Sequence, residues 1–247
     1  NDRKVQELRV LLAECATTQA AATWLMQTRE WDFLAVYYET IDRFAHAFME
    51  FHPPKASHLT DEEFERYQGA MTGCYRFHDM MLGRLMKLAG DETTVMIVSD
   101  HGFHSDHLRP EGSSKIEGGR PVAWHRRYGV LAVRGPRIKK DQFVYGASLL
   151  DITPTVLVML GCPAARDMDG KPLRQIFDVE KLEIAEIDTY ESSAADSAPA
   201  NTPEDPWVAR QLLARLVDLG YIENDSTEGA ALDRARNLGQ LYASTGR

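Results

Sequence analysis

The stretch "VMIVSDHGFHSDH" (residues 95–107) decides how this chain is interpreted. Its first four residues form an apolar run of the kind found in buried strands. Asp100 and His101 follow directly, and then come a glycine and two further histidines. In open α/β sheets, ligands bind beyond the carboxyl ends of the strands. The stretch therefore predicts a strand that delivers a carboxylate and an imidazole to a ligand-binding edge.

Strand-like and helix-like segments alternate along the rest of the chain. Short apolar or aromatic runs predict strands over residues 32–40, 93–100 and 128–135. Helical spacing of apolar residues predicts helices over residues 3–28, 41–52, 61–90 and 148–161. This alternation is typical of an α/β domain with a mainly parallel sheet, and α/β is the expected fold class.

The composition excludes several classes of protein. The 247 residues are 44% hydrophobic, which is enough for a substantial core, and the formal net charge of −9 argues against nucleic acid as a bulk electrostatic partner. No apolar run approaches the roughly 18–20 residues of a membrane span. The three cysteines are far apart and include no CxxC pair, so they predict neither a disulfide framework nor a zinc knuckle, and they are consistent with a reducing compartment.

A second acid and two more histidines complete a candidate metal-binding set. Asp42 directly follows the first predicted strand, and His46 lies four residues later on the same helix face. His125 precedes the third predicted strand. With Asp100 and His101, the set is two aspartates and three histidines, which suits zinc or a similar divalent ion. We expect these five side chains to converge at one edge of the sheet.

The number of ligands indicates an incomplete two-metal site. Two divalent ions about 3.5–4 Å apart form a common hydrolytic arrangement. Asp42, His46 and His125 could fill one site, whereas Asp100 and His101 give the second site only two ligands. An additional acid and an activated nucleophile are missing, and both are expected upstream of the first residue.

Four stretches in this order carry a family resemblance: "AVYYETIDRFAHAF", "TTVMIVSDHGF", "WHRRYGVLAVRGPRIK" and "GASLLDITPTVLVMLGCPAARDMDGKPL". They cover roughly residues 20–178 and resemble the alkaline phosphatase superfamily, and within it the type I phosphodiesterase/nucleotide pyrophosphatase group. The resemblance implies a mainly parallel sheet with helices on both faces, here incomplete. It implies that Asp42, His46 and His125 bind one metal and that Asp100 and His101 bind the other.

The resemblance also implies an activity and its missing parts. The family's Ser or Thr nucleophile, a further metal-binding Asp and its first strands have no counterpart here, so the chain resembles the C-terminal two-thirds or less of a catalytic domain. The implied function is hydrolysis of phosphate esters, most simply phosphodiesters or nucleotide pyrophosphates, with two divalent ions. Zinc is favoured and manganese is the alternative. Sulfatase, phosphonate hydrolase and phosphomutase chemistry remain open on the same scaffold.

The last part of the chain predicts a different organisation. We expect residues 1–180 to belong to the catalytic domain, 181–205 to form a linker rich in small and polar residues, and 206–247 to form a helical tail. The terminal "AALDRARNLGQLYASTGR" resembles the first helix of a tetratricopeptide repeat, and such repeats need about three units for stability. A second class of function is therefore a protein-interaction module with an accessory or inactive hydrolase domain.

Residues 101–127 have no clear period and predict a long functional loop that forms part of the substrate wall. The loop offers further candidates whose roles the sequence leaves open. His104 and His107 are either loop residues or additional metal contacts. The cationic residues either bind substrate anions or are simply solvated: Arg109, Lys115 and Arg120.

Overall fold

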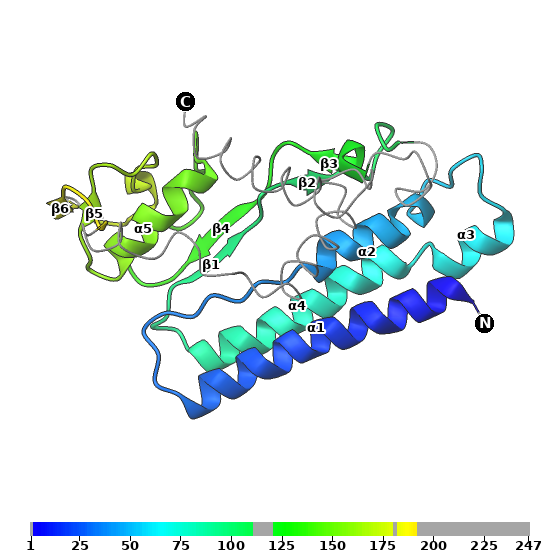
Figure 1. Cartoon of the computed structure of the whole chain (residues 1–247), viewed down its shortest axis with the longest axis horizontal. Coiled ribbons are helices and arrows are strands. Elements are labelled where there is room, and N and C mark those ends of the chain that lie inside the picture. The colour runs from blue at the N-terminus through cyan, green and yellow to red at the C-terminus, as the bar shows by residue number, and fades with distance from the viewer. Residues whose placement is uncertain (1, 111–120, 180–181, 192–247) are drawn as a thin grey trace, which may run out of the picture. The chain divides into compact units, whose positions relative to one another are not determined.

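A long helix, α1 (Arg3–Thr28), runs beside α2 (Thr40–Phe48) and α4 (Ala70–Ala89) and forms a helical layer with them (Figure 1). Asp2 caps α1 by accepting a hydrogen bond from the backbone N–H of Lys4. The buried residues of α1 lie four and seven positions apart, so they line one face of the helix: Leu11, Cys15 and Ala22. The predicted helix over residues 3–28 is confirmed.

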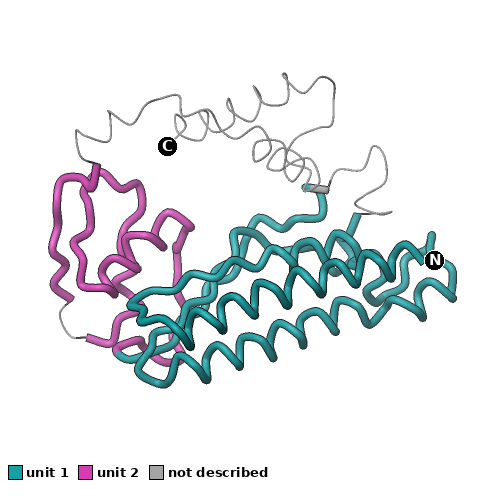
Figure 2. The backbone as a smooth tube through the Cα atoms, turned by 60° about the horizontal axis from the view of Figure 1, so that its bottom comes forward, with its two compact units in different colours: residues 1–136 teal, residues 137–247 magenta. Residues whose placement is uncertain are grey.

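The computed structural model describes residues 2–110, 121–179 and 182–191. The chain divides into two compact units, residues 1–136 and residues 137–247, which are coloured separately in Figure 2. The described part contains helices together with small sheets, which is consistent with the α/β class. None of its helices is both long enough and apolar enough to cross a membrane. The predicted helical tail, residues 206–247, and most of the predicted linker lie outside the described residues.

The core of the first unit lies mainly between helices α1, α2 and α4. Phe44 and Phe48 of α2 are almost fully buried, as are Leu11 of α1 and Met71 of α4. Trp124 joins this core from a part of the chain that is distant in sequence. Burying a side chain of this size contributes about 1.5–3 kcal/mol. The core thereby fixes α2 firmly within the first unit.

The predicted helix over residues 61–90 is two helices, α3 (Asp61–Tyr67) and α4. Thr60 caps α3 in a reciprocal capping box with Glu63. The helix is interrupted at Gln68 and Gly69, the residues between α3 and α4. Gly90 ends α4 with a positive φ of 76°.

The expected mainly parallel sheet is not present among the described residues. The strands β1 (Val95–Val98) and β4 (Leu131–Arg134) confirm two predicted strands, but they pair antiparallel, from Val95 opposite Arg134 to Val98 opposite Leu131. No third strand joins them in the described part of the chain, so this sheet has two strands. Ile97 and Val98 are accordingly exposed and not buried as predicted, because nothing described covers that end of β1.

The predicted strand over residues 32–40 is also wrong for this chain. Residues 33–38 adopt no regular secondary structure, and α2 already begins at Thr40. A strand requires a neighbour that accepts and donates its backbone hydrogen bonds. No described strand pairs with this segment, so its apolar composition alone does not make it a strand.

Two further short strands continue the antiparallel pair. The strand β2 (Gly102–Phe103) pairs with β3 (His125–Arg126), which follows the 3₁₀ turn η2 (Pro121–Trp124). Three residues, 99–101, lie between β1 and β2, whereas four residues, 127–130, lie between β3 and β4. The register therefore changes by one residue, as at a β-bulge, and bulges often re-aim side chains beside functional sites. Asp100 and His101 lie at this point.

The second unit is built around α5 (Ile152–Met159), which follows the 3₁₀ turn η3 (Leu149–Asp151). Pro154 lies in the first turn of α5, where its missing N–H removes no helical hydrogen bond. The unit also contains η4 (Arg174–Ile176) and the parallel pair of β5 (Ala164–Ala165) and β6 (Glu186–Ile187). Its buried side chains include Leu173, Ile176 and Phe177.

Asp151 and Thr155 give the "DITPT" and "DGKPL" stretches a structural role. Asp151 accepts hydrogen bonds from the backbone N–H groups of Ser148 and Lys171, both at 2.8 Å. The fully buried Thr155 hydroxyl accepts from Leu173 N at 2.9 Å and donates to the carbonyl of Asp151. These side chains fasten residues 171–173 to the start of α5.

Gly129 provides a test of how closely the segment between β3 and β4 approaches the segment between β1 and β2. A methyl group at Gly129 would overlap the backbone carbonyl of Ser99, whereas one at Gly73, on α4, meets nothing within 4 Å. We expect Gly129→Ala to lower the free energy of unfolding by about 1–3 kcal/mol through overpacking. Gly73→Ala should raise it by about 0.5–1 kcal/mol. Urea denaturation measures both, and equal effects would contradict the packing at Gly129.

Asp151 provides a test of the second unit. Burial raises the pKa of Asp151, but the hydrogen bonds from Lys171 and Ser148 outweigh it, so the folded-state pKa lies below the ordinary value. Its stabilisation is therefore complete above the unfolded pKa of about 3.9 and is lost as the pH falls through the lower folded-state pKa. Asp151→Asn should destabilise the chain at pH 7, and this deficit should shrink in acid.

Urea midpoints of the two proteins across this pH range provide the measurement. Asp188→Asn is the control, because its carboxylate is 88% exposed and pairs only with Arg166 among the described residues. A deficit for Asp151→Asn that is constant down to about pH 2 would contradict the assignment.

Candidate metal centre

Helix α2 presents an aspartate and a histidine on one face. Asp42 lies in the first turn and His46 lies one turn later, so their side chains are neighbours. The distance from His46 Nε2 to Asp42 Oδ1 is 3.5 Å. His46 is buried, and Phe103 packs edge-on against its ring at 5.0 Å. The core residues of α2 hold both groups in place.

The strand β3 delivers the third member of the centre. His125 Nε2 lies 3.3 Å from Asp42 Oδ1 and 2.8 Å from His46 Nε2. The donor atoms of Asp42, His46 and His125 all lie within 4.8 Å of one another. Sequence spacing alone placed His125 in an irregular loop, and its pairing with Phe103 in the β2–β3 ladder fixes it here.

The spacing of these three atoms fits a divalent cation such as zinc. Zn–N and Zn–O bonds of about 2.0–2.1 Å at tetrahedral angles place neighbouring ligand atoms about 3.3 Å apart. The observed separations are 2.8, 3.3 and 3.5 Å. Three protein ligands leave a fourth tetrahedral position for water or substrate, which is the arrangement of a catalytic zinc site.

The Asp42 carboxylate is the electrostatic centre of the group. Its Oδ1 atom is buried, and the nitrogens of His46, His125 and His101 lie 3.3–3.9 Å away, longer than an ordinary hydrogen bond. Burial raises the pKa of Asp42, but the polar contact with His125 and the charges of the three imidazoles outweigh it, so the pKa lies below its usual value. An ionised carboxylate that has one oxygen buried without a short hydrogen bond favours a bound cation.

His101 lies beside this triad. Its ring stacks on His125 with centroids 3.8 Å apart and an interplanar angle of 13°. Its Nε2 atom is 3.9 Å from Asp42 Oδ1 and 3.8 Å from Asp100 Oδ2. Its Nδ1 atom lies 3.0 Å from the carbonyl of Gly102, which can only accept a hydrogen bond, so Nδ1 donates and the lone pair of the neutral ring is on Nε2.

Asp100 is the most peripheral of the five predicted ligands. Its side chain is 62% exposed, and its contacts are with His101: the 3.8 Å approach of the imidazole and a 3.1 Å hydrogen bond from the His101 backbone N–H. The structure thus brings the predicted residues into one neighbourhood as a triad and an adjoining pair. Their role as metal ligands remains a prediction.

The remaining loop candidates lie away from the triad or outside the described residues. His104 approaches Asp106 at 3.9 Å and belongs to a turn after β2. His107 is exposed, and Lys115 and Arg120 lie in the part that the structure does not describe. Arg109 bonds to backbone carbonyls beyond α2. We did not predict the packing roles of Phe103 and Trp124, although Phe103 lies two positions from His101 and Trp124 directly precedes His125.

Comparisons with known proteins support a relation to the alkaline phosphatase superfamily. A family model described as type I phosphodiesterase/nucleotide pyrophosphatase matches residues 2–111, a range that contains α2 and the Asp100–His101 pair. Arylsulfatase K from Gallus gallus is 29% identical over 157 residues, covering 61% of this chain and 26% of that protein. Arylsulfatase K from Danio rerio is 28% identical over 138 residues, covering 53% and 25%.

The chain spans about a quarter of the length of these curated relatives. No solved structure matches it. The comparisons thus relate this chain to hydrolases of the superfamily.

Metal titration tests the triad directly. We expect Asp42→Asn, His46→Gln and His125→Gln each to weaken Co²⁺ binding on the order of 100-fold or more, because each removes one of three ligands and even outer-shell changes cost 10–100-fold. His101→Gln should have a smaller effect. His107→Gln is the matched control and should bind like the unaltered chain. Equal affinities for all five proteins would contradict the site.

Proposed function

We propose that this chain is part of a metal-dependent hydrolase of phosphate esters, with phosphodiesters or nucleotide pyrophosphates as the preferred substrates. The observation that carries the proposal is the convergence of Asp42, His46 and His125, whose ligand atoms lie within 4.8 Å of one another and could bind one divalent ion. The match of residues 2–111 to the type I phosphodiesterase/nucleotide pyrophosphatase family supports it over the part of the chain that contains Asp42 and His46.

The residues would divide the chemistry as follows. Asp42, His46 and His125 would hold one divalent ion, and Asp100 and His101 would contribute to a second, with zinc favoured and manganese as the alternative. Such ions stabilise the negative charge that develops on phosphoryl oxygens and help to activate a nucleophile. The stacking of His101 on His125 would keep the two half-sites adjacent.

The nucleophile is proposed to come from outside this sequence. The hydroxyl of Ser99, beside the site, donates to the carbonyl of His101 at 2.6 Å. The hydroxyl of Thr40, at the start of α2, is buried and contacts His78. Burial keeps Thr40 from a substrate, and the Ser99 proton is directed at a carbonyl and not at a base. The chain also covers only about a quarter of the length of its curated relatives. A Ser or Thr and a further metal-binding acid are therefore proposed to lie elsewhere in the whole protein.

Sulfate-ester hydrolysis is the second candidate, because the two curated relatives are named arylsulfatases. The family match favours the phosphate ester, because that family is described as type I phosphodiesterase/nucleotide pyrophosphatase. The triad, with two imidazoles and one carboxylate, has the donor set of zinc sites. A protein-partner role for the predicted repeat tail also remains a prediction, and it falls on residues outside the described part.

Activity assays separate these candidates. The full-length protein should hydrolyse bis(4-nitrophenyl) phosphate at least tenfold faster than 4-nitrophenyl sulfate, with the activity lost on chelation and restored by Zn²⁺ or Mn²⁺. The isolated 247-residue chain should be nearly inactive on both. A faster reaction with the sulfate ester would transfer the assignment to a sulfatase. Robust turnover by the isolated chain would show that its own residues include the nucleophile.

A further inference from the structure

We propose that Arg109 is a positioning residue for the candidate metal centre, because its guanidinium holds the strand that carries His125 in register with helix α2. This inference rests on the proposed function and deepens it by naming what aligns the two halves of the site. One half, Asp42 and His46, belongs to α2, and the other half belongs to the antiparallel strands.

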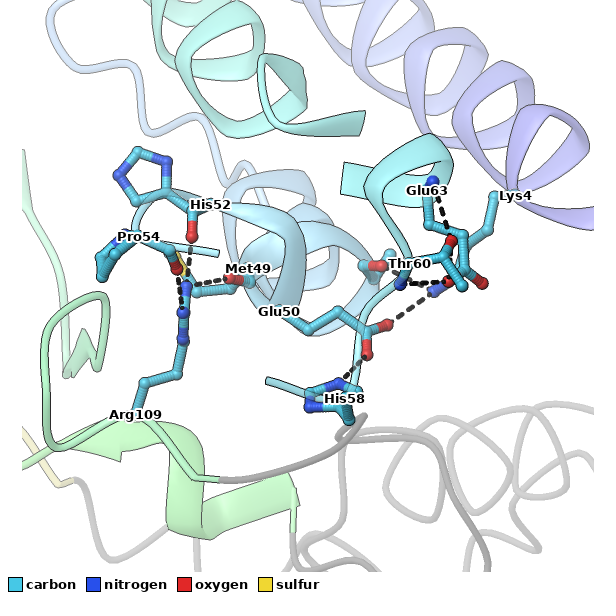
Figure 3. Close-up of polar contacts among 10 residues, drawn as sticks. Lys4, Met49, Glu50, His52, Pro54, His58, Thr60, Glu63 and Arg109 are labelled. Carbon is cyan, nitrogen blue, oxygen red and sulfur yellow. Dashed lines mark hydrogen bonds and ion pairs between the residues drawn. The ribbon is translucent and has the colours of Figure 1, made fainter. Parts of the chain in front are cut away.

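The end of α2 leaves backbone carbonyls without helical partners. The helix continues into η1 (Met49–Phe51), and the last carbonyls of a helical segment need hydrogen bonds from elsewhere. Arg109 Nη1 donates to the carbonyl of Met49 at 3.1 Å and to that of His52, and Nη2 donates to the carbonyl of Pro54 at 2.7 Å (Figure 3). One planar guanidinium thus binds three carbonyls in fixed directions.

A second cation, Lys4 of the N-terminal helix α1, also bonds to the end of α2. Lys4 of α1 donates to the carbonyl of Ala47 at 2.7 Å and lies 3.4 Å from the buried carboxylate of Glu50 (Figure 3). Positive charge at a helix C-terminus also interacts favourably with the helix dipole. The end of α2 is therefore held by α1 through Lys4 and by the strand segment through Arg109.

A short and well-bonded path connects Arg109 to His125. Arg109 N donates to the carbonyl of Asp106 at 3.1 Å, which closes a turn after β2. His104 N donates to the carbonyl of Trp124 at 2.8 Å, and the next pair in the ladder is Phe103 opposite His125. A shift of Arg109 would therefore be transmitted through the turn to the ladder and to the His125 ring.

This geometry decides between the two roles that the sequence left open for Arg109. At least three of its five N–H donors already bind backbone carbonyls of residues 49–54, which are 55–60 positions away in sequence. A guanidinium occupied in this way is not available to bind a substrate phosphate. Arg109 is therefore a residue that aligns the site and not one that contacts the ester.

Co²⁺ affinity tests the proposal in the complete 247-residue chain. Arg109→Gln should weaken Co²⁺ binding by about 10–100-fold, the usual effect of losing a supporting residue around a metal site. Arg109→Lys, which keeps a cation with three donors, should recover part of the loss. Arg134→Gln is the matched control, because Arg134 is exposed and its carboxylate contact is with the exposed Asp91 at 3.7 Å; it should bind like the unaltered chain.

A double-mutant cycle separates positioning from a general loss of stability. If Arg109 acts through His125, then Arg109→Gln should have little further effect on Co²⁺ affinity in a chain that already carries His125→Gln. Additive losses, or no loss for Arg109→Gln alone, would overturn the proposal. Metal affinity is measured well below the unfolding midpoint of each variant, so that unfolding does not contribute.

A readout without metal keeps this inference distinct from the proposed function. The rings of His46 and His125 lie 4.9 Å apart, close enough for a nuclear Overhauser effect between their ring protons. This signal should be present in the unaltered chain and in Arg134→Gln, and lost or much weaker in Arg109→Gln. If the unaltered chain bound no Co²⁺, the metal assignment would fail. A signal that persisted in Arg109→Gln would contradict the role of Arg109.

Discussion

The site depends on one constraint, which is an ionised, partly buried carboxylate that faces imidazoles without a short hydrogen bond at its buried oxygen. Taking a carboxylate out of water is costly unless a charge or hydrogen bonds compensate. Asp42 Oδ1 lies 3.3–3.9 Å from the nitrogens of His46, His125 and His101. A divalent ion between these groups would satisfy the carboxylate and the imidazole lone pairs at once. The buried oxygen of Asp42 and the proposed metal binding therefore belong to the same group of side chains.

The fold serves this constraint by fixing two segments that are far apart in sequence. Helix α2 is held by its core residues Phe44 and Phe48, and its end is held by Lys4 and Arg109. The antiparallel ladder fixes His125 against Phe103, and a one-residue change of register places Asp100 and His101 beside it. Each half of the site is therefore attached to regular structure.

The sequence predicted which side chains would come together better than it predicted the sheet, and their role as metal ligands remains a prediction. Asp42 and His46 were recognisable because a spacing of four places two ligands on one helix face, which is a purely local property. His125 was a candidate from its place before the third predicted strand, and its assignment as a ligand came mainly from the family resemblance, since its position depends on pairing with Phe103, more than twenty residues earlier. The parallel sheet was predicted from the alternation of helical segments with strand-like segments over residues 32–40, 93–100 and 128–135. Composition does not show which segments pair. Residues 33–38 have no described partner strand and are irregular, whereas β1 pairs antiparallel with β4.

X-ray absorption spectroscopy at the zinc edge, on the Zn²⁺-loaded 247-residue chain, tests the central claim most directly. The account predicts two imidazole nitrogens and carboxylate or water oxygen at about 2.0–2.1 Å, with one imidazole lost in His125→Gln. A first shell with sulfur at about 2.3 Å, which would come from cysteine, would contradict it. So would a shell of oxygen alone that is identical in the two proteins.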